Sequence, residues 1–390
     1  MVPLWVQLLL LVAAGMVLLY HGTVILFAAQ LPRLEPSTAP PSSGPRPRVS
    51  VVIAARDEEL DLPETLNGVL AQDYPNLEIV VVDGGSTDRT REIARDRDPR
   101  IRVLEEPPLP PGWVGKNWAC EVGARATKGE YLFFLDADVR LESSAIRTTV
   151  EWAERESADL ATTAPRVAME GFWERLVLPF FSEMVLVYFR APRVNLATSS
   201  AAMANGQFLL VRRSSYDTVG GHAAVRGAVL EDVALARRFR AHGLTLRMAL
   251  APGLGTTRMY RDRHEMFEGL LKNVHGTEFV AARQVGFLVG LATLYLLPLG
   301  LLPFGLWTGT PLLIGVGAFL YLALFGKQVI FARGSGAPAV YGLLFPLAVA
   351  YYLRLVGSSL ARGWARQPTT WKGRAYPLRL PPPKGPAGSG

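Results

Sequence analysis

Paired carboxylates stand directly after an apolar run, where side chains can meet a charged ligand. Asp136 and Asp138 are separated by one residue at the end of YLFFL. In an extended segment, side chains i and i+2 point the same way, and carboxylate oxygens are the ligands that Mg²⁺ and Mn²⁺ prefer. The pair therefore predicts a divalent-metal site. An ordinary turn at the end of a strand is the alternative interpretation.

Two further polar positions have residue types suited to a reaction beside such a metal. Lys116 ends the segment GWVGK just before a predicted helix, where backbone N–H groups and an ammonium suit a phosphate. A solvated loop lysine is the alternative there. Glu231 and Asp232 precede another predicted helix, where an Asp is well suited to N-capping.

The elements that hold these residues alternate between buried strands and amphipathic helices. The strand-length apolar runs are VSVVIAA, LEIVVVD, IRVLEE and EYLFFLDAD, and helical patterns separate them. Such alternation predicts a mainly parallel, doubly wound α/β sheet, in which ligands bind beyond the carboxyl ends of the strands. The absence of GxGxxG after the first run disfavours a dinucleotide fold, and the absence of GxxxxGK[ST] excludes a P-loop.

Long uncharged segments flank this α/β region. Residues 1–32 carry no charge, and neither does the stretch between Arg283 and Lys327, which prolines and glycines near 303–311 divide into two helices. A bilayer core of about 30 Å needs about 20 helical residues, so the sequence predicts an integral membrane protein. A third apolar run at 337–357 is interrupted by Arg354, and we expect it to be re-entrant or interfacial.

The distribution of charge agrees with a membrane partner and makes a nucleic-acid partner unnecessary. The formal net charge is +7, yet the last acidic residue is Glu278 and ten Lys or Arg follow it. Cations around apolar segments face anionic headgroups. The single cysteine, Cys120, excludes an intramolecular disulfide.

Composition divides the chain into five expected parts. They are a transmembrane anchor (1–31), a Pro/Ser linker (32–47), a catalytic α/β domain (48–280), C-terminal membrane helices (284–360) and a basic tail (361–390). The cations at 33, 46 and 48 follow the first helix, which predicts a multi-pass protein of the cell (inner) membrane with a cytoplasmic catalytic domain. Lys327 and Arg333 are interpreted as part of an inside loop. The aromatic segment 171–190 is either an interfacial lipid entry path or packing against other helices.

Several motifs together resemble one enzyme family. VSVVIAARDEE, VVVDGGSTDRT, GWVGKNWA, GEYLFFLDADV and VLEDVALARRFRAHG follow the order seen in family 2 inverting glycosyltransferases. The resemblance covers residues 49–272 and the tail motif WKGR, and it is closest to the membrane-bound branch that glycosylates carotenoids or related lipids. It implies a GT-A fold, Mg²⁺ or Mn²⁺, a nucleotide-sugar donor such as UDP-glucose, and glucosyl transfer to a carotenoid hydroxyl or carboxyl group.

The resemblance also implies roles for individual residues of this sequence. Asp232 is the expected general base, with Glu231 beside it, and Asp136 and Asp138 are the expected metal ligands. The expected donor contacts are Ala54, Arg56, Glu58, Asp83, Lys116 and Asp136. The expected acceptor side comprises Gly206, Gln207 and His222. Residues expected to close over the donor are Arg258, Tyr260, Lys272, Trp371 and Arg374.

The sequence departs from the family pattern in places, and other functions compete. Gly84 stands where a second Asp is usual, and Ala54 begins the segment that replaces Pro-x-Asn-Glu. The segment 258–262 lacks the Trp of processive synthases, which argues against a polysaccharide synthase. A hopanoid, a diacylglycerol or a ceramide-like lipid are the alternative acceptors. A transporter is disfavoured because the C-terminal helices carry few polar residues.

Overall fold

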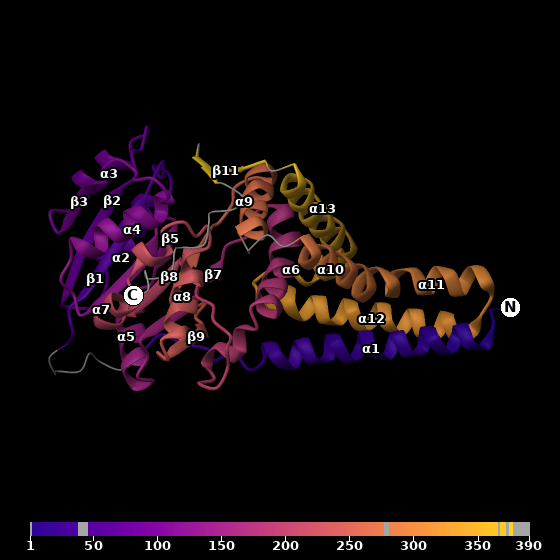
Figure 1. The fold of residues 1–390 in the computed structure, drawn as a ribbon. Coiled ribbons are helices and arrows are strands. Elements are labelled where there is room, and N and C mark those ends of the chain that lie inside the picture. The colour runs from indigo at the N-terminus through magenta and orange to yellow at the C-terminus, as the bar shows by residue number, and fades with distance from the viewer. Residues whose placement is uncertain (1, 38–45, 277–280, 366, 372–373, 377–390) are drawn as a thin grey trace, which may run out of the picture. The chain divides into compact units, whose positions relative to one another are not determined.

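The computed structural model describes residues 2–37, 46–276, 281–365, 367–371 and 374–376 (Figure 1). The chain divides into two compact units, each described here by itself. The α/β unit comprises 31–168, 189–259 and 370–390, and the helical unit comprises 1–30, 169–188 and 260–369.

A seven-stranded sheet in the order β3-β2-β1-β4-β8-β6-β9 is the centre of the α/β unit. Every neighbouring pair is parallel except those of β8, which runs antiparallel to β4 and β6. The strands are β1 (Val49–Ala55), β2 (Leu77–Asp83), β3 (Ile101–Glu105), β4 (Tyr131–Asp136), β6 (Leu160–Ala164), β8 (Phe208–Arg212) and β9 (Leu246–Leu250). The mainly parallel sheet predicted from the sequence is therefore confirmed.

Helices and a small second sheet complete the α/β unit. The second sheet has the order β5-β10-β7, with β5 (Val139–Leu141), β7 (Arg166–Val167) and β10 (Gly255–Thr257). The helices are α2 (Leu62–Leu70), α3 (Thr90–Arg97), α4 (Gly115–Arg125), α5 (Ala145–Arg155), α7 (Arg213–Thr218) and α8 (Glu231–Ala241), with the 3₁₀ turns η1 (Ala191–Asn195) and η2 (His222–Val225). The core is the buried apolar face between sheet and helices, and includes Val51, Ile53 and Phe133.

The strand register brings three polar strand ends to one edge of the sheet. Ala55 of β1 pairs with Asp83 of β2, and Ala54 pairs with Asp136 of β4. In the structure α3 begins at Thr90, and the Asp88 carboxylate accepts its backbone N–H at 3.0 Å.

The helical unit contains three helices that are long and apolar enough to cross a membrane: Leu4–Ala28, Ala282–Thr308 and Pro311–Gly334. Gly309 separates the last two with a φ of 62°, a left-handed conformation that glycine adopts without strain. α1 and α11 both pack against α12 (Figure 1). The helices are α1 (Leu4–Ala28), α6 (Phe172–Tyr188), α9 (Arg263–Gly276), α10 (Ala281–Leu291), η3 (Ala292–Leu296), α11 (Leu297–Thr308), α12 (Pro311–Gly334), η4 (Ala339–Gly342) and α13 (Phe345–Trp364). The short strands β11 (Thr369–Trp371) and β12 (Arg374–Tyr376) pair with each other, and from residue 370 onward the chain is assigned to the α/β unit.

Lys327 lies inside α12, and its interpretation as a loop charge is wrong. Its ammonium is buried and pairs with Glu183 of α6 at 2.5 Å. It also contacts His21 of α1 and Tyr295 of the π-helical turn η3, at 3.0 and 3.1 Å. An apolar environment makes a charge expensive unless it is paired, which explains why the two charges lie together. The helices thus carry more buried charge than their uncharged stretches predicted.

The aromatic segment at 171–190 forms α6, and the structure shows it packed within the helical unit. α6 contacts α12 and α13, and its Glu183 is fully buried in the ion pair with Lys327. Packing against other helices, one of the two predicted alternatives, accounts for its apolar faces. A lipid entry path along this segment stays a prediction.

Candidate functional site

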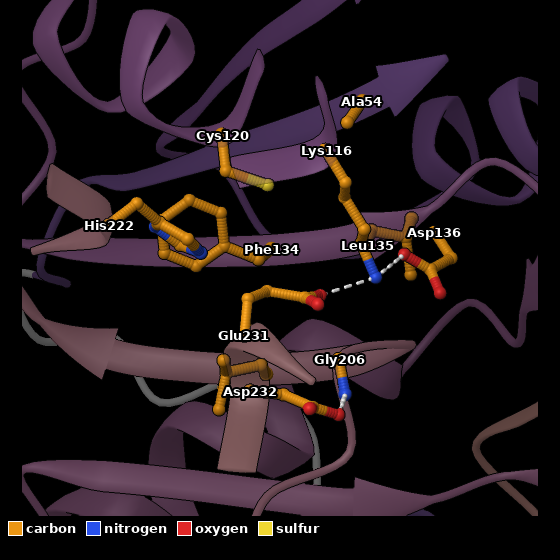
Figure 2. A pocket seen from close by; sticks show the side chains of 11 residues that line it. Ala54, Lys116, Cys120, Phe134, Leu135, Asp136, Gly206, His222, Glu231 and Asp232 are labelled. Atoms are coloured by element: carbon orange, nitrogen blue, oxygen red, sulfur yellow. Dashed lines mark hydrogen bonds and ion pairs between the residues drawn. The ribbon is translucent and has the colours of Figure 1, made fainter. Parts of the chain in front are cut away.

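A pocket opens at the edge of the sheet where the polar strand ends meet (Figure 2). Lys116 of α4, Asp136 of β4 and the pair Glu231–Asp232 of α8 supply its charges, and Gly206 supplies a backbone N–H group. The remaining lining residues are Ala54, Cys120, Phe134, Leu135, Leu209 and His222. The fold therefore gathers residues that lie far apart in the sequence, from Ala54 to Asp232, into one pocket.

Lys116 lies between two carboxylates. Its Nζ is 2.7 Å from Asp136 Oδ1 and 2.7 Å from Glu231 Oε1. Burial favours a lower pKa for Lys116, but the charges of Asp136 and Glu231 outweigh burial and hold the pKa well above its ordinary value. The ammonium is therefore a permanent positive charge in the pocket. A phosphate that enters the pocket would compete for it with these two carboxylates.

The two neighbouring carboxylates of α8 have opposite electrostatic environments. Burial works against ionisation of Glu231, but Lys116 outweighs it and lowers the pKa of Glu231. Burial and the Glu231 charge raise the pKa of Asp232 to about 7. Two carboxyl groups whose pKa values are driven apart are suited to different tasks, and a pKa near neutrality suits a general base.

Backbone groups hold the Asp232 carboxylate in place. Asp232 Oδ2 accepts the Gly206 N–H at 2.8 Å (Figure 2), and Oδ1 accepts the Val233 N–H at 2.7 Å. A Cβ on Gly206 would lie 3.1 Å from both Glu231 Oε1 and Lys116 Nζ. α8 begins at Glu231, so the pair lies in its first turn rather than at the cap position, and the bond from the Val233 N–H satisfies one donor of that turn.

Asp138 is half-buried, and one of its oxygens is buried without a partner in the described part of the chain. Its Oδ2 accepts a hydrogen bond from Thr257 Oγ1 at 3.2 Å, while Oδ1 has no partner among the described residues. Burial, with the charges of Asp136 and Glu58, raises the pKa of Asp138 to about 7. A cation beside Asp136 and Asp138 would satisfy the orphan oxygen, so the donor set fits a divalent metal. No group of three or more His, Cys, Asp or Glu side chains within the described ranges could hold one by itself.

The loops after β1 and β2 are tied together, which positions three of the predicted donor contacts. Arg56 Nη1 donates to Gly84 O at 3.0 Å, and Glu58 N–H donates to Thr90 Oγ1 at 2.7 Å. Asp83 lies beside them, 1% exposed, and is not among the residues that line the pocket. Of the predicted donor residues, Ala54, Lys116 and Asp136 line it.

Asp83 has an intramolecular partner that its sequence position does not reveal. Its Oδ2 accepts two hydrogen bonds from Arg91 of α3, at 2.8 and 3.0 Å, and Oδ1 accepts the Ser86 N–H at 3.2 Å. Burial tends to raise the pKa of Asp83, but these bonds outweigh burial and lower it. Asp83 therefore organises its own loop, and its contact with the donor base stays a prediction.

The predicted acceptor residues lie on the β8 side of the pocket. Gln207 Nε2 donates to Thr257 Oγ1 at 3.2 Å, and through this hydroxyl Gln207 is linked to Asp138. His222 lines the pocket and its Nδ1 lies 2.8 Å from the Tyr216 hydroxyl. Burial lowers the pKa of His222 to about 4, so its ring is neutral at physiological pH. Thr257, which joins the two sides, gave no signal in the sequence.

The residues predicted to close over the donor are not brought together by either unit alone. Arg258 belongs to the α/β unit, whereas Tyr260 and Lys272 belong to the helical unit. Trp371 and Arg374 lie in β11 and β12. Arg258, which shares the α/β unit with the pocket, is not among its lining residues. The role of all five residues stays a prediction.

The sheet order and the pocket at the carboxyl ends of the strands are those of a ligand-binding α/β domain, and known proteins share this domain. Residues 50–220 match the family model described as Glycosyl transferase family 2. Over these residues the chain is similar to the family 2 glycosyltransferases.

Two curated relatives and one solved structure describe the similarity further. The 4,4'-diaponeurosporenoate glycosyltransferase of Staphylococcus haemolyticus is 28% identical over 229 residues, which are 58% of this chain and 60% of that protein. The beta-monoglucosyldiacylglycerol synthase of Nostoc sp. is 27% identical over 286 residues, covering 67% of this chain and 58% of that protein. The chain thus spans less than two thirds of these relatives.

The solved structure shows the fold. It is the mannosyltransferase PcManGT from Pyrobaculum calidifontis in complex with GDP-Man and Mn²⁺, and it is 19% identical. The TM-score is 0.54, and the alignment covers 93% of this chain and 99% of that one. The predicted GT-A fold is therefore confirmed, with a mainly parallel sheet and apolar helices at both ends of the chain.

Proposed function

We propose that this protein is an inverting glycosyltransferase that moves a sugar from a nucleoside diphosphate to a lipophilic acceptor at a membrane. The observation that carries the proposal is the environment of Asp232. Its carboxylate lies in the pocket, is aligned by the Gly206 N–H, and has a pKa of about 7 because of burial and Glu231. The similarity to family 2 glycosyltransferases and the three helices able to cross a membrane support the same conclusion.

Asp232 acts as the general base of a direct displacement. The acceptor hydroxyl gives its proton to Asp232 while its oxygen bonds to the anomeric carbon. The bond between that carbon and the diphosphate oxygen breaks on the opposite face, so the configuration inverts. A positioned base contributes about 10²–10⁴-fold to such a step. Glu231, ionised and paired with Lys116, keeps Asp232 basic enough at neutral pH to accept the proton.

Lys116 stabilises the departing nucleoside diphosphate. The leaving group gains negative charge as the sugar bond breaks, and preorganised positive charge lowers the energy of that state. Lys116 also lies at the start of α4, where the helix terminus favours an anion. Binding of the diphosphate exchanges one of the carboxylate partners of Lys116 for a phosphate oxygen.

Asp136 and Asp138 are the residues that would hold Mg²⁺ or Mn²⁺. A bound divalent ion neutralises diphosphate charge and orients the donor. Asp138 offers the unpaired, buried oxygen, and Thr257 fixes its other oxygen. We assign these two side chains to the donor end of the site, where Asp136 lines the same pocket as Asp232.

A glucosyl donor such as UDP-glucose and a carotenoid acceptor with a hydroxyl or carboxyl end group are the substrates we propose. One relative is named for a carotenoid acid and another for a diacylglycerol product, and both compounds are lipophilic. Diacylglycerol is the second candidate acceptor for that reason. We further propose that the domain faces the cytoplasm, because Arg33, Arg46 and Arg48 follow the first helix.

Transfer by Asp232→Asn tests the assignment of the base. With a hydroxyl acceptor, we expect the rate to fall about 10²–10⁴-fold while donor binding, measured by titration calorimetry, stays unchanged. A carboxylic-acid acceptor is already ionised at pH 7, so we expect a much smaller loss with it. The readout is added hexose in lipid products, measured by mass spectrometry.

A matched control is Asp217→Asn, which changes an exposed carboxylate of α7 away from the pocket. It should behave as the wild type in both assays. Full turnover of a hydroxyl acceptor by Asp232→Asn would exclude Asp232 as the base.

A further inference from the structure

A cluster of aromatic side chains joins three helices of the helical unit. Trp173 at the start of α6 and Phe267 of α9 both lie against Tyr351 of α13, with ring centroids 5.9 Å apart in each case. These three helices also contact one another pairwise. The cluster lies away from the α/β unit's pocket in sequence and shares no residue with it.

Two arginines cover this cluster. The guanidinium of Arg263 lies 4.5 Å from the centroid of the Trp173 ring, and that of Arg354 lies 5.2 Å from the Phe267 ring. Both side chains are exposed, and neither makes an ion pair with a carboxylate in the part of the chain that the structure describes. Arg362, further along α13, differs because Glu268 neutralises it at 3.0 Å.

The Tyr351 hydroxyl between these arginines is buried and unpartnered. The residue is 6% exposed, and its hydroxyl oxygen has no hydrogen-bond partner among the described residues. Both arginines are close enough for their charges to act on this phenol. A buried donor without a partner costs stability, so such a group calls for an acceptor from outside the protein.

We propose that Tyr351, Arg263 and Arg354 form a binding site for the headgroup phosphate of an anionic membrane lipid. Guanidinium forks bind phosphate oxygens in bidentate geometry. Stacking on Trp173 and Phe267 holds both forks in place without consuming their N–H donors. The phenol supplies one further donor to the same anion.

The surroundings favour a lipid over free phosphate. Trp, Tyr and Arg gather at the depth of membrane headgroups, and Phe172 beside Trp173 is 46% exposed, which leaves an apolar surface next to the cations. The chain after Glu278 holds only positive charges, and such segments are attracted to anionic leaflets. A lipid satisfies both the cations and the apolar surface, whereas inorganic phosphate satisfies only the cations.

Native mass spectrometry of the full chain in detergent tests the site. The probes are dioctanoyl phosphatidylglycerol, dioctanoyl phosphatidylcholine and sodium phosphate, each titrated in the absence of sugar donor. We expect phosphatidylglycerol to bind at least tenfold more tightly than the other two. Tyr351→Phe should weaken that binding about fivefold, and Arg263→Gln with Arg354→Gln about tenfold or more.

Controls separate this site from general charge attraction and from misfolding. Arg333→Gln removes an exposed cation from α12 and should bind phosphatidylglycerol like the wild type. Tyr351→Phe removes a hydroxyl without a partner, so its melting temperature should not fall.

Three results would overturn the proposal. The first is that Tyr351→Phe and the double Arg variant bind phosphatidylglycerol as tightly as the wild type. The second is that Arg333→Gln loses as much phosphatidylglycerol affinity as those variants. The third is that the melting temperature of Tyr351→Phe falls. Equal binding of sodium phosphate and phosphatidylglycerol would overturn the assignment to a lipid. None of these readouts depends on sugar transfer, so they stand apart from the test of Asp232.

Discussion

At the scale of single residues, the site depends on which of three carboxylates pair with its one cation. Lys116 pairs with Asp136 and Glu231 at equal distances of 2.7 Å. Asp232 accepts hydrogen bonds from backbone N–H groups and, within the described part of the chain, has no such cation beside its carboxylate, so it binds a proton more readily. The pKa of Glu231 falls while that of Asp232 rises to about 7. Two adjacent residues of one helix thus have different pKa values because they contact different groups.

The pH dependence of transfer to a hydroxyl acceptor follows from the raised pKa of Asp232. A base works in its deprotonated form, so the rate should rise about tenfold per pH unit below 7 and level off above 7. Asp138 also has a pKa raised to about 7, so the assay uses saturating Mg²⁺ or Mn²⁺, which would keep that carboxyl ionised. The residual rate of Asp232→Asn should lack the inflection. An inflection near pH 4 in the wild type would contradict this assignment.

The sequence predicted which charged residues belong to the site but not which residues they contact. Strand-end positions and the Asp-x-Asp spacing are local features, so Asp136, Asp138 and Lys116 could be predicted. The bond between Asp83 and Arg91 and the link from Gln207 through Thr257 to Asp138 depend on how separate loops meet. Such pairings have no local signal. Cys120, Phe134 and Leu209 line the pocket for the same reason without any residue type that indicates a site.

At the scale of elements, the position of Lys116 depends on how closely α4 approaches the sheet. Gly123 of α4 faces β1, and a Cβ there would lie 2.3 Å from Val52 Cγ1. Val52 is fully buried and β-branched, so its side chain has little freedom to move. The alternation of strands and helices predicted that helices cover the sheet. The close contact of α4 with β1 and the antiparallel direction of β8 could not be predicted from the sequence and are seen only in the structure.

Gly123→Ala should therefore destabilise the α/β unit despite the better helix propensity of alanine. Overpacking costs about 1–3 kcal/mol, against a gain of up to about 1 kcal/mol in propensity. Thermal unfolding and transfer activity are measured together, since a displaced α4 moves Lys116. Val52→Ala removes the methyl group that clashes with Ala at position 123. The double variant should therefore lose less stability than the sum of the losses of the two single variants. Simple additivity would mean that this contact does not limit the packing of α4.

At the scale of the whole molecule, buried charge links helices that are remote in sequence. Glu183 of α6 accepts hydrogen bonds from Lys327 and Gln328 of α12 and from Tyr295, while Lys327 also meets His21 of α1. A lysine at the end of an uncharged stretch is typical of a loop at the membrane surface. Its partner lies 144 residues earlier in the chain, and for that reason sequence patterns placed Lys327 wrongly.

Removing one member of this pair should destabilise the helical unit strongly. Lys327→Met leaves the Glu183 carboxylate buried without its cation, and such losses cost about 3–5 kcal/mol. We expect a large fall in the melting temperature of the full chain in detergent, and a similar fall for Glu183→Gln. The double variant leaves no unpaired charge, so it should melt at a higher temperature than Lys327→Met. Arg333→Gln, on the exposed surface of the same helix, is the control and should melt like the wild type. If the two single losses simply add in the double variant, the residues do not stabilise the molecule as an ion pair.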